Sequence, residues 1–154
     1  MKIFKVLALA MMLSLPLLAS AELDNEDQIA MSTALGSGDI KTVKKYLDSG
    51  VNVNDTYFAW SALQIAANHN QLKMVKFLVE RGADVNYTHP VTKMTALSMA
   101  AFNGSDEVVK YLISKGANVN AKLKDDANLV TALRHFGQDK TADILVAAGA
   151  KEGD

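Results

Sequence analysis

The feature that most constrains this chain of 154 residues is an internal repeat marked by glycine. Four similar segments, such as Tyr111-Leu112-Ile113-Ser114-Lys115-Gly116, end at Gly50, Gly82, Gly116 and Gly149, so the intervals are 32, 34 and 33 residues. A fixed period of this length is the signature of stacked units, each of which buries its apolar face only against a neighbour. The repeat therefore predicts a solenoid.

Residue types within each period indicate a pair of helices. Ser61 and Thr95 stand where a hydroxyl can cap a helix N-terminus. Leu72, Val75 and Leu78 recur at helical spacing and predict a buried stripe on a second helix. The glycines follow that stripe, where a left-handed residue commonly ends a helix. Each unit is thus predicted to be helix-turn-helix, and the fold class to be all-α.

The period and its ending resemble the ankyrin repeat. The inner-helix signature of that family, Thr-Pro-Leu-His-x-Ala-Ala, is present in altered form as Ser61-Ala62-Leu63-Gln64-Ile65-Ala66-Ala67 and as Thr95-Ala96-Leu97-Ser98-Met99-Ala100-Ala101, without the proline and the histidine. The resemblance implies an ankyrin-repeat solenoid of about four stacked units, with two central repeats and a capping repeat at each end. The expected repeats cover residues 22–54, 55–86, 87–120 and 121–151.

The two ends of the solenoid differ from its central repeats. Thr131-Ala132-Leu133 matches the start of an inner helix, but the period places the capping position at Asn128, which predicts a helix over residues 129–136. Polar residues then replace apolar ones in the last outer helix, as a terminal repeat facing water requires; these are Asp139, Lys140, Thr141 and Asp143. At the other end, we expect a helix from residues 24–27 to about Leu35, with Gly38-Asp39 opening its partner.

The first residues have the pattern of a secretory signal peptide. Lys2 and Lys5 precede an apolar stretch over residues 6–18, and Ala19-Ser20-Ala21 follows. We expect cleavage between Ala21 and Glu22, which leaves a mature repeat domain of residues 22–154. The alternative is an uncleaved membrane anchor, although the apolar stretch is shorter than the roughly 20 residues that a spanning helix needs.

Composition excludes several classes of function. The chain has no cysteine, so disulfides, thiolate metal sites and a cysteine nucleophile are excluded. Loss of Lys2 and Lys5 would leave 14 basic against 17 acidic residues, unlike the basic surface of a nucleic-acid-binding protein. The three histidines lack the spacing of metal ligands, and no catalytic motif is found. We expect no enzyme activity, no cofactor, no metal and no catalytic residue.

Ankyrin arrays usually bind other proteins through the turns between repeats and the exposed side of the inner helices, on a concave face. Carried over by position, this implies a protein-binding surface in three parts. The candidate residues are Tyr57, Phe58, Trp60, Asn68 and His69 in the second repeat, Val91, Thr92, Met94, Phe102 and Asn103 in the third, and Lys124, Asp125, Ala127, His135 and Phe136 in the last.

The turn Tyr57-Phe58-Ala59-Trp60 carries three aromatic rings, including the only tryptophan. Exposed tyrosine and tryptophan side chains often anchor protein interfaces. The alternative is that Phe58 and Trp60 fold back to cover the first helical pair. In the next repeat, the turn containing His89-Pro90 is one residue longer than the period, either as a tolerated insertion or to reach a ligand.

These observations predict a monomeric, non-enzymatic module that binds another protein, with no nucleic acid and no membrane bound by the mature form. Three glycosylation sequons begin at Asn54, Asn86 and Asn103, and sugars there would crowd the binding face. A bacterial periplasm, which also suits the short, lysine-led signal peptide, is therefore the expected location. Family resemblance suggests a role in stress defence; the alternatives are an immunity protein that neutralises an antibacterial toxin and a secreted effector directed at a host.

Overall fold

The computed structural model describes residues 23–153. The predicted signal peptide, residues 1–21, lies outside the described residues. Helices dominate this part of the chain, which also contains a short hairpin and a 3₁₀ turn. In chain order the elements are α1 Asn25–Ser37, α2 Ile40–Asp48, β1 Thr56–Tyr57, β2 Trp60–Ser61, α3 Ala62–Asn68, α4 Leu72–Glu80, α5 Ala96–Phe102, α6 Asp106–Ser114, η2 Lys124–Asp126, α7 Leu129–His135 and α8 Asp139–Ala147.

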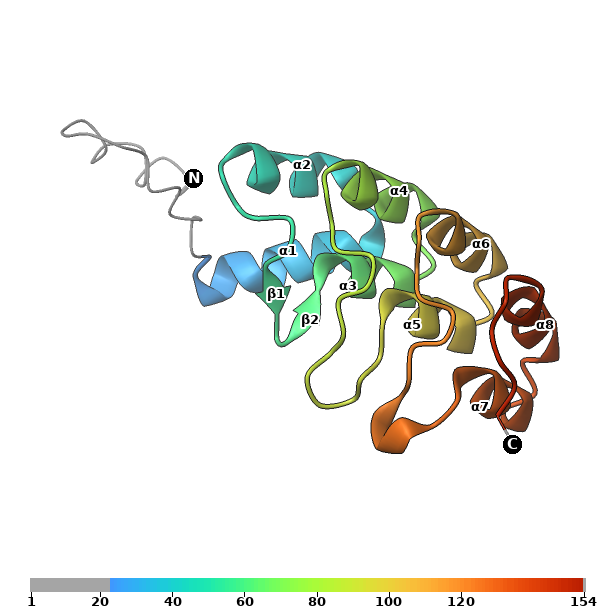
Figure 1. The fold of residues 1–154 in the computed structure, drawn as a ribbon. Helices are drawn as coiled ribbons and strands as arrows, with labels where there is room; N and C mark the ends of the chain where they lie inside the picture. Colours follow the sequence, from blue (N-terminus) through green and yellow to red (C-terminus); the bar gives the residue numbers. More distant parts are fainter. Residues whose placement is uncertain (1–22, 154) are drawn as a thin grey trace, which may run out of the picture.

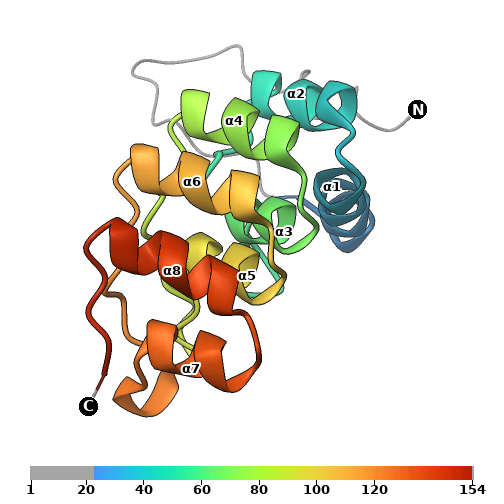
Figure 2. The ribbon, with the colours of Figure 1, turned by 90° about the vertical axis from the view of Figure 1, so that its right-hand side faces the viewer.

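The helices form two layers, as Figure 1 shows. Inner helices α1, α3, α5 and α7 make one row, and outer helices α2, α4, α6 and α8 make the other (Figure 2). Neighbouring inner helices contact one another along the row, and each outer helix packs on the inner helix that precedes it. The predicted all-α solenoid of four helical pairs is confirmed. Among the described helices, none combines the length and the apolar character needed to cross a bilayer.

Helix ends follow the capping signals of the sequence. The Ser61 and Thr95 hydroxyls accept hydrogen bonds from the third residues of α3 and α5, Gln64 and Ser98, whose side chains in turn accept from the backbone N–H of the capping residue. Past each outer helix lies one of the glycines that define the period, with φ between 86° and 102°. Left-handed backbone of this kind strains residues with a Cβ, which explains why glycine recurs at this position in every repeat.

The core runs between the two layers. It is built from leucine, valine and methionine side chains with alanines where helices approach closely, and Ala66, Ala67, Ala100 and Ala101 are completely buried. A larger side chain at these positions would push neighbouring inner helices apart. Close packing of the inner row therefore depends on the alanine pairs that the sequence repeats.

Asparagine side chains join successive repeats at the ends of the outer helices. Asn86 accepts a hydrogen bond from the Asn118 N–H at 2.8 Å and donates one to the Gly116 carbonyl at 3.1 Å. Asn54 and Asn120 make the same pair of bonds with the repeats that follow them. Each amide thus satisfies one donor and one acceptor of the next turn, and these bonds fix the spacing of the repeats.

The last repeat begins where the period predicts. Asn128 caps α7 by accepting from the Thr131 N–H at 3.0 Å, and the helix ends at His135, within one residue of the expected limit. The prediction for Thr141 was wrong, because its side chain is 1% exposed. Its hydroxyl donates to Asp106 of α6 at 3.0 Å, so α8 uses this polar residue to contact the preceding repeat instead of water.

Candidate protein-binding surface

The aromatic turn is a β-hairpin with a two-residue turn, and its three aromatic rings differ in how far they are buried. Tyr57 pairs with Trp60 across β1 and β2, which leaves Phe58 and Ala59 as the turn residues. Both have left-handed backbone, with φ of 53° and 70°. Hairpins of this type favour Asn-Gly at these two positions, whereas a bulky residue with positive φ is strained. The strained turn holds the Phe58 side chain in solvent, 65% exposed.

Tyr57 is the one predicted contact residue that is almost completely buried, and its role as a contact residue stays a prediction. Its side chain is 2% exposed, and within residues 23–153 its hydroxyl is a buried polar group without a hydrogen-bond partner. Burial, together with nearby Asp55 and Tyr46, raises the pKa of this phenol above its usual value. It is Tyr57, and not Phe58, that covers the first helical pair.

We call the turns that precede α3, α5 and α7 the fingers; they are residues 55–61, 87–95 and 121–128. Trp60 packs against the finger of the next repeat. Its ring lies 3.9 Å from that of His89, measured between centroids, with 32° between the planes. His89 is 7% exposed, and its Nδ1 accepts hydrogen bonds from the Val91 and Thr92 N–H groups, both at 3.2 Å. The histidine in the longer turn therefore shapes its own loop, and does not reach outward to a ligand.

A buried glutamine ties the same loop to α3. The Gln64 Nε2 donates to the Met94 carbonyl at 2.7 Å, and its Oε1 accepts from the Ser61 N–H at 2.9 Å. The role of Gln64 was not predicted. The signal that could have indicated it is its position, because Gln64 stands where the family signature has histidine. Together, Gln64 and His89 fix the turn after the second repeat at both of its ends.

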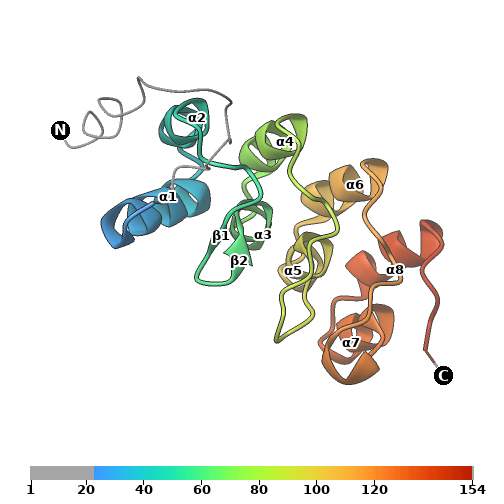
Figure 3. The ribbon, with the colours of Figure 1, turned by 60° about the vertical axis from the view of Figure 1, so that its left-hand side comes forward.

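These contacts place several predicted residues around one groove between the fingers and the inner helices. Figure 3 shows the backbone of this region, with the β1–β2 hairpin next to α3 and the loop that precedes α5. The groove holds about 460 Å³, and we call it the central groove. It is lined by Ser32, Tyr57, Phe58, Trp60, Ile65, Asn68, His69, Met94 and Met99. Ile65 and Met99 were not predicted, although they occupy the same place in successive repeats.

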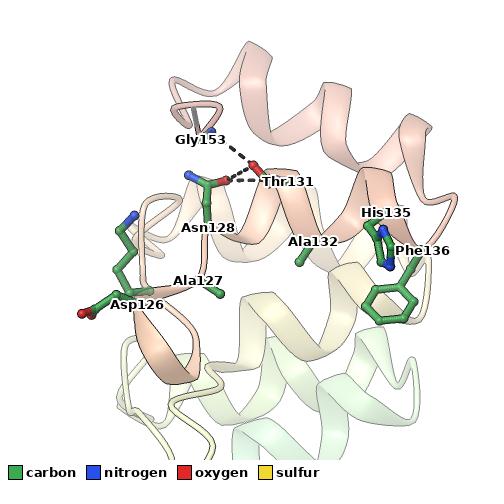
Figure 4. A pocket seen from close by; sticks show the side chains of 9 residues that line it. Asp126, Ala127, Asn128, Thr131, Ala132, His135, Phe136 and Gly153 are labelled. Atoms are coloured by element: carbon green, nitrogen blue, oxygen red, sulfur yellow. Dashed lines mark hydrogen bonds between the residues drawn. The ribbon is translucent and has the colours of Figure 1, made fainter.

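A second hollow of about 660 Å³ lies at the C-terminal end of the inner row. Figure 4 shows His135 and Phe136 on one side of it, Asp126 and Ala127 on the other, and Ala132 between them. We call it the C-terminal hollow. Three of these residues, Ala127, His135 and Phe136, were predicted from the sequence.

An aromatic cluster lies at the C-terminal ends of α5 and α7. Phe136 is 68% exposed and contacts the rings of Phe102 and His135 edge-on, at centroid distances of 5.9 and 5.3 Å. Next to it, Asn103 donates to the backbone carbonyl of Asn68 at 2.8 Å, which links α5 to α3 along the exposed side of the inner row. The predicted residues of the inner helices thus form one continuous surface.

The remaining predicted residues lie on the fingers. Val91 is 67% exposed at the tip of its loop, and Thr92 is half-buried behind it. Lys124 and Asp125 are exposed on η2, where the Lys124 N–H donates to the Thr92 carbonyl at 3.2 Å. Lys124 and Asp125 line neither the central groove nor the C-terminal hollow.

Nothing in the described part of the chain gathers the groups that metal binding requires. Within residues 23–153, no cluster of three or more histidine or acidic side chains is placed to hold a metal ion. What the surface offers instead is exposed aromatic and aliphatic side chains beside asparagine amides and imidazoles. That combination is typical of a surface for protein recognition.

The fold and this surface define a helical-repeat binding protein. A family model for ankyrin repeats in three copies matches residues 9–89, 28–125 and 82–153, and the chain belongs to this family.

Curated relatives share shorter stretches. The "Ankyrin repeat, SAM and basic leucine zipper domain-containing protein 1" of Mus musculus is 42% identical over 55 residues, which cover 35% of this chain and 12% of the relative. The proteins of that name from Atelerix albiventris and Ovis aries are 39% identical over 56 residues and 35% identical over 63, covering 36% and 40% of this chain and 12% and 13% of the relatives. The matched part of this chain therefore spans about one-eighth of the length of these relatives. All three are mammalian, so they lend no support to the predicted bacterial source.

Proposed function

We propose that this protein works by binding another polypeptide on the surface formed by its fingers and the exposed side of its inner helices, and that it has no enzyme activity. The observation that carries the proposal is the Phe58 turn. Bulky residues avoid left-handed backbone, and exposed aromatic rings gain nothing from solvent. Here a strained left-handed backbone and an exposed aromatic ring occur at one position next to a groove. This combination is favoured where the ring contacts a partner.

Further support comes from the distribution of exposed apolar side chains. Phe58, Val91 and Phe136 are each about two-thirds exposed, and all three lie on the fingers or at the end of an inner helix. On the outer helices, Val146 is 37% exposed. The two hollows are on the side of the molecule where these residues gather, which favours this face over the outer one as the binding surface.

Photocrosslinking tests the surface in the cell that produces the protein. A photoreactive phenylalanine analogue replaces Phe58 in one variant and Phe136 in a second, and Val146 on α8 in the matched control. We expect the first two variants to crosslink the same partner protein and the control to crosslink none. Adducts formed only from the Val146 position, or from none of the three, would refute the proposed surface.

We also propose that the protein acts as a monomer in the bacterial periplasm, after cleavage between Ala21 and Glu22. Support comes from the lysine-led apolar segment and the small residues before Glu22. The proposed mature domain, residues 22–154, contains all the described helices. Intact mass measurement of the protein from fractionated cells tests this: a chain beginning at Glu22 in the periplasmic fraction is expected, and a cytoplasmic chain that keeps residues 1–21 contradicts it.

A further inference from the structure

Charge is distributed unequally between the two layers. Every outer helix carries at least three charged residues, as in Leu72–Glu80 with Lys73, Lys76 and Glu80. The central inner helices α3 and α5 carry none. The absence extends along the row, because the positions equivalent to Ile65, Asn68 and His69 are uncharged in every repeat. They are Thr33, Gly36 and Ser37, then Met99, Phe102 and Asn103, and finally Ala132, His135 and Phe136.

Asp27 on α1 and Arg134 on α7 contact other elements of the fold. On α7, the Arg134 guanidinium contacts Asp143 of α8 and Glu152, away from the groove residues. On α1, the Asp27 carboxylate accepts a hydrogen bond from the Tyr46 hydroxyl of the outer helix α2 at 2.8 Å. The side chains that line the central groove include no Asp, Glu, Lys or Arg. Charge lies only around it, for example at Lys93 on a finger and at Lys122 and Asp126 in the C-terminal hollow.

From this distribution we infer what kind of partner the surface takes: an extended polypeptide segment that carries apolar side chains and no charge. The inference rests on the proposed function, whose partner it describes more closely. A charged side chain brought into the central groove would lose water without meeting an opposite charge, and an unpaired desolvated charge opposes binding. Apolar side chains meet Ile65, Met94 and Met99 there, and thioethers adapt to side chains of different shape.

The shape of the surface favours an extended segment. The uncharged row crosses four inner helices, and packed helices lie about 10 Å apart, so it is roughly 30 Å long. An extended chain covers that length with about nine residues. Within the row, the amide and imidazole groups of Asn68, His69 and Asn103 are exposed and can hydrogen-bond to the backbone of such a segment. The surface is therefore long, and polar groups lie between the central groove and the C-terminal hollow.

A random dodecapeptide library tests the inference with the protein purified from cells that produce it from its full sequence. The peptides selected should lack Asp, Glu, Lys and Arg in their central positions and carry apolar residues there. Their dissociation constants should change by less than about twofold between low and high salt, because screening acts on charges only. In the variant His69→Lys, which adds a charge to the row, they should rise by about tenfold or more. The matched control Val146→Lys adds the same charge to α8 and should leave them unchanged.

The other outcomes separate this inference from the proposed function. Selected peptides with a shared acidic or basic residue, and affinity that falls about tenfold in high salt, would overturn the uncharged partner while leaving protein binding intact. Failure to select any peptide would also overturn it, because the partner would not be a linear segment. Peptides that bind His69→Lys as well as they bind the parent would occupy another face, which would refute the groove in both proposals.

Discussion

Replacing the strained turn by Asn-Gly should make the protein more stable and a poorer binder. Phe58 and Ala59 have φ of 53° and 70°, and left-handed backbone costs a residue with a Cβ about 1–2 kcal/mol. Phe58→Asn with Ala59→Gly relieves both residues, because asparagine tolerates this conformation and glycine adopts it freely. Relief of the two residues is therefore worth about 3 kcal/mol.

Two losses offset part of this gain. Phe58 is 65% exposed, so about a third of its side chain packs on the protein. At roughly 200 Å² for an enclosed phenylalanine, this amounts to ~70 Å² and ~2 kcal/mol, of which asparagine retains about half. Glycine at position 59 also adds up to about 1 kcal/mol of unfolded-state entropy. The net expectation is a gain of about 1 kcal/mol, or about 4 °C in the melting temperature.

Thermal and urea denaturation measure this, with the single variant Ala59→Gly as the matched control. The control releases the strain of one residue and keeps the Phe58 ring, so it should gain about half as much stability as the double variant while binding the partner normally. The double variant alone should lose affinity. If both variants melt below the parent protein, the turn does not have the left-handed geometry on which the reasoning depends.

Three other changes test separate parts of the fold. Tyr57→Phe removes the buried hydroxyl that lacks a partner among the described residues, so chemical denaturation should show unchanged stability or a gain of up to about 1 kcal/mol. Asn86→Ala breaks the two bonds to the repeat that follows, and calorimetry should show a loss of about 1 kcal/mol, whereas an unchanged melting temperature would show that the amide bridge does not stabilise the stack. The bonds to Lys140 and Thr141 hold the pKa of Asp106 below its ordinary value of 3.8, so its stabilisation is present above that pH and is lost as pH falls through the lowered pKa. Stability measured from about pH 5 downward should therefore show the deficit of Asp106→Asn shrinking with acidification, and a constant deficit would exclude this ion pair as its cause.

The sequence predicted the fold because the period and the capping residues agree at each repeat. The glycine spacing placed the cap of α7 at Asn128 despite the competing local match at Thr131, and the structure confirms that position. Thr141 could not be predicted in the same way. A polar residue on a terminal helix is usually exposed, and only the position of Asp106 across the α6–α8 contact explains its burial.

The aromatic turn shows where prediction of the site failed. Composition indicated exposed aromatic residues, but which ring faces solvent depends on the backbone of the two turn residues. Because bulky residues avoid positive φ, the residue types alone do not predict that Phe58 and Ala59 form the turn and that Tyr57 lies in the core. The role of His89 was hidden for a similar reason, since its bonds to Val91 and Thr92 exist only once its loop has formed.

Hydrogen–deuterium exchange tests the central claim most directly. It is measured on the unsubstituted protein, free and in complex with the partner that crosslinking identifies, so it reports the contacted backbone without any mutation. We expect slower exchange in the complex over residues 56–61 and 89–94 and at the C-terminal ends of α3 and α5. Exchange in the outer helices α4 and α6 should be unchanged. Protection confined to the outer helices, with the fingers exchanging as in the free protein, would contradict the proposed binding surface.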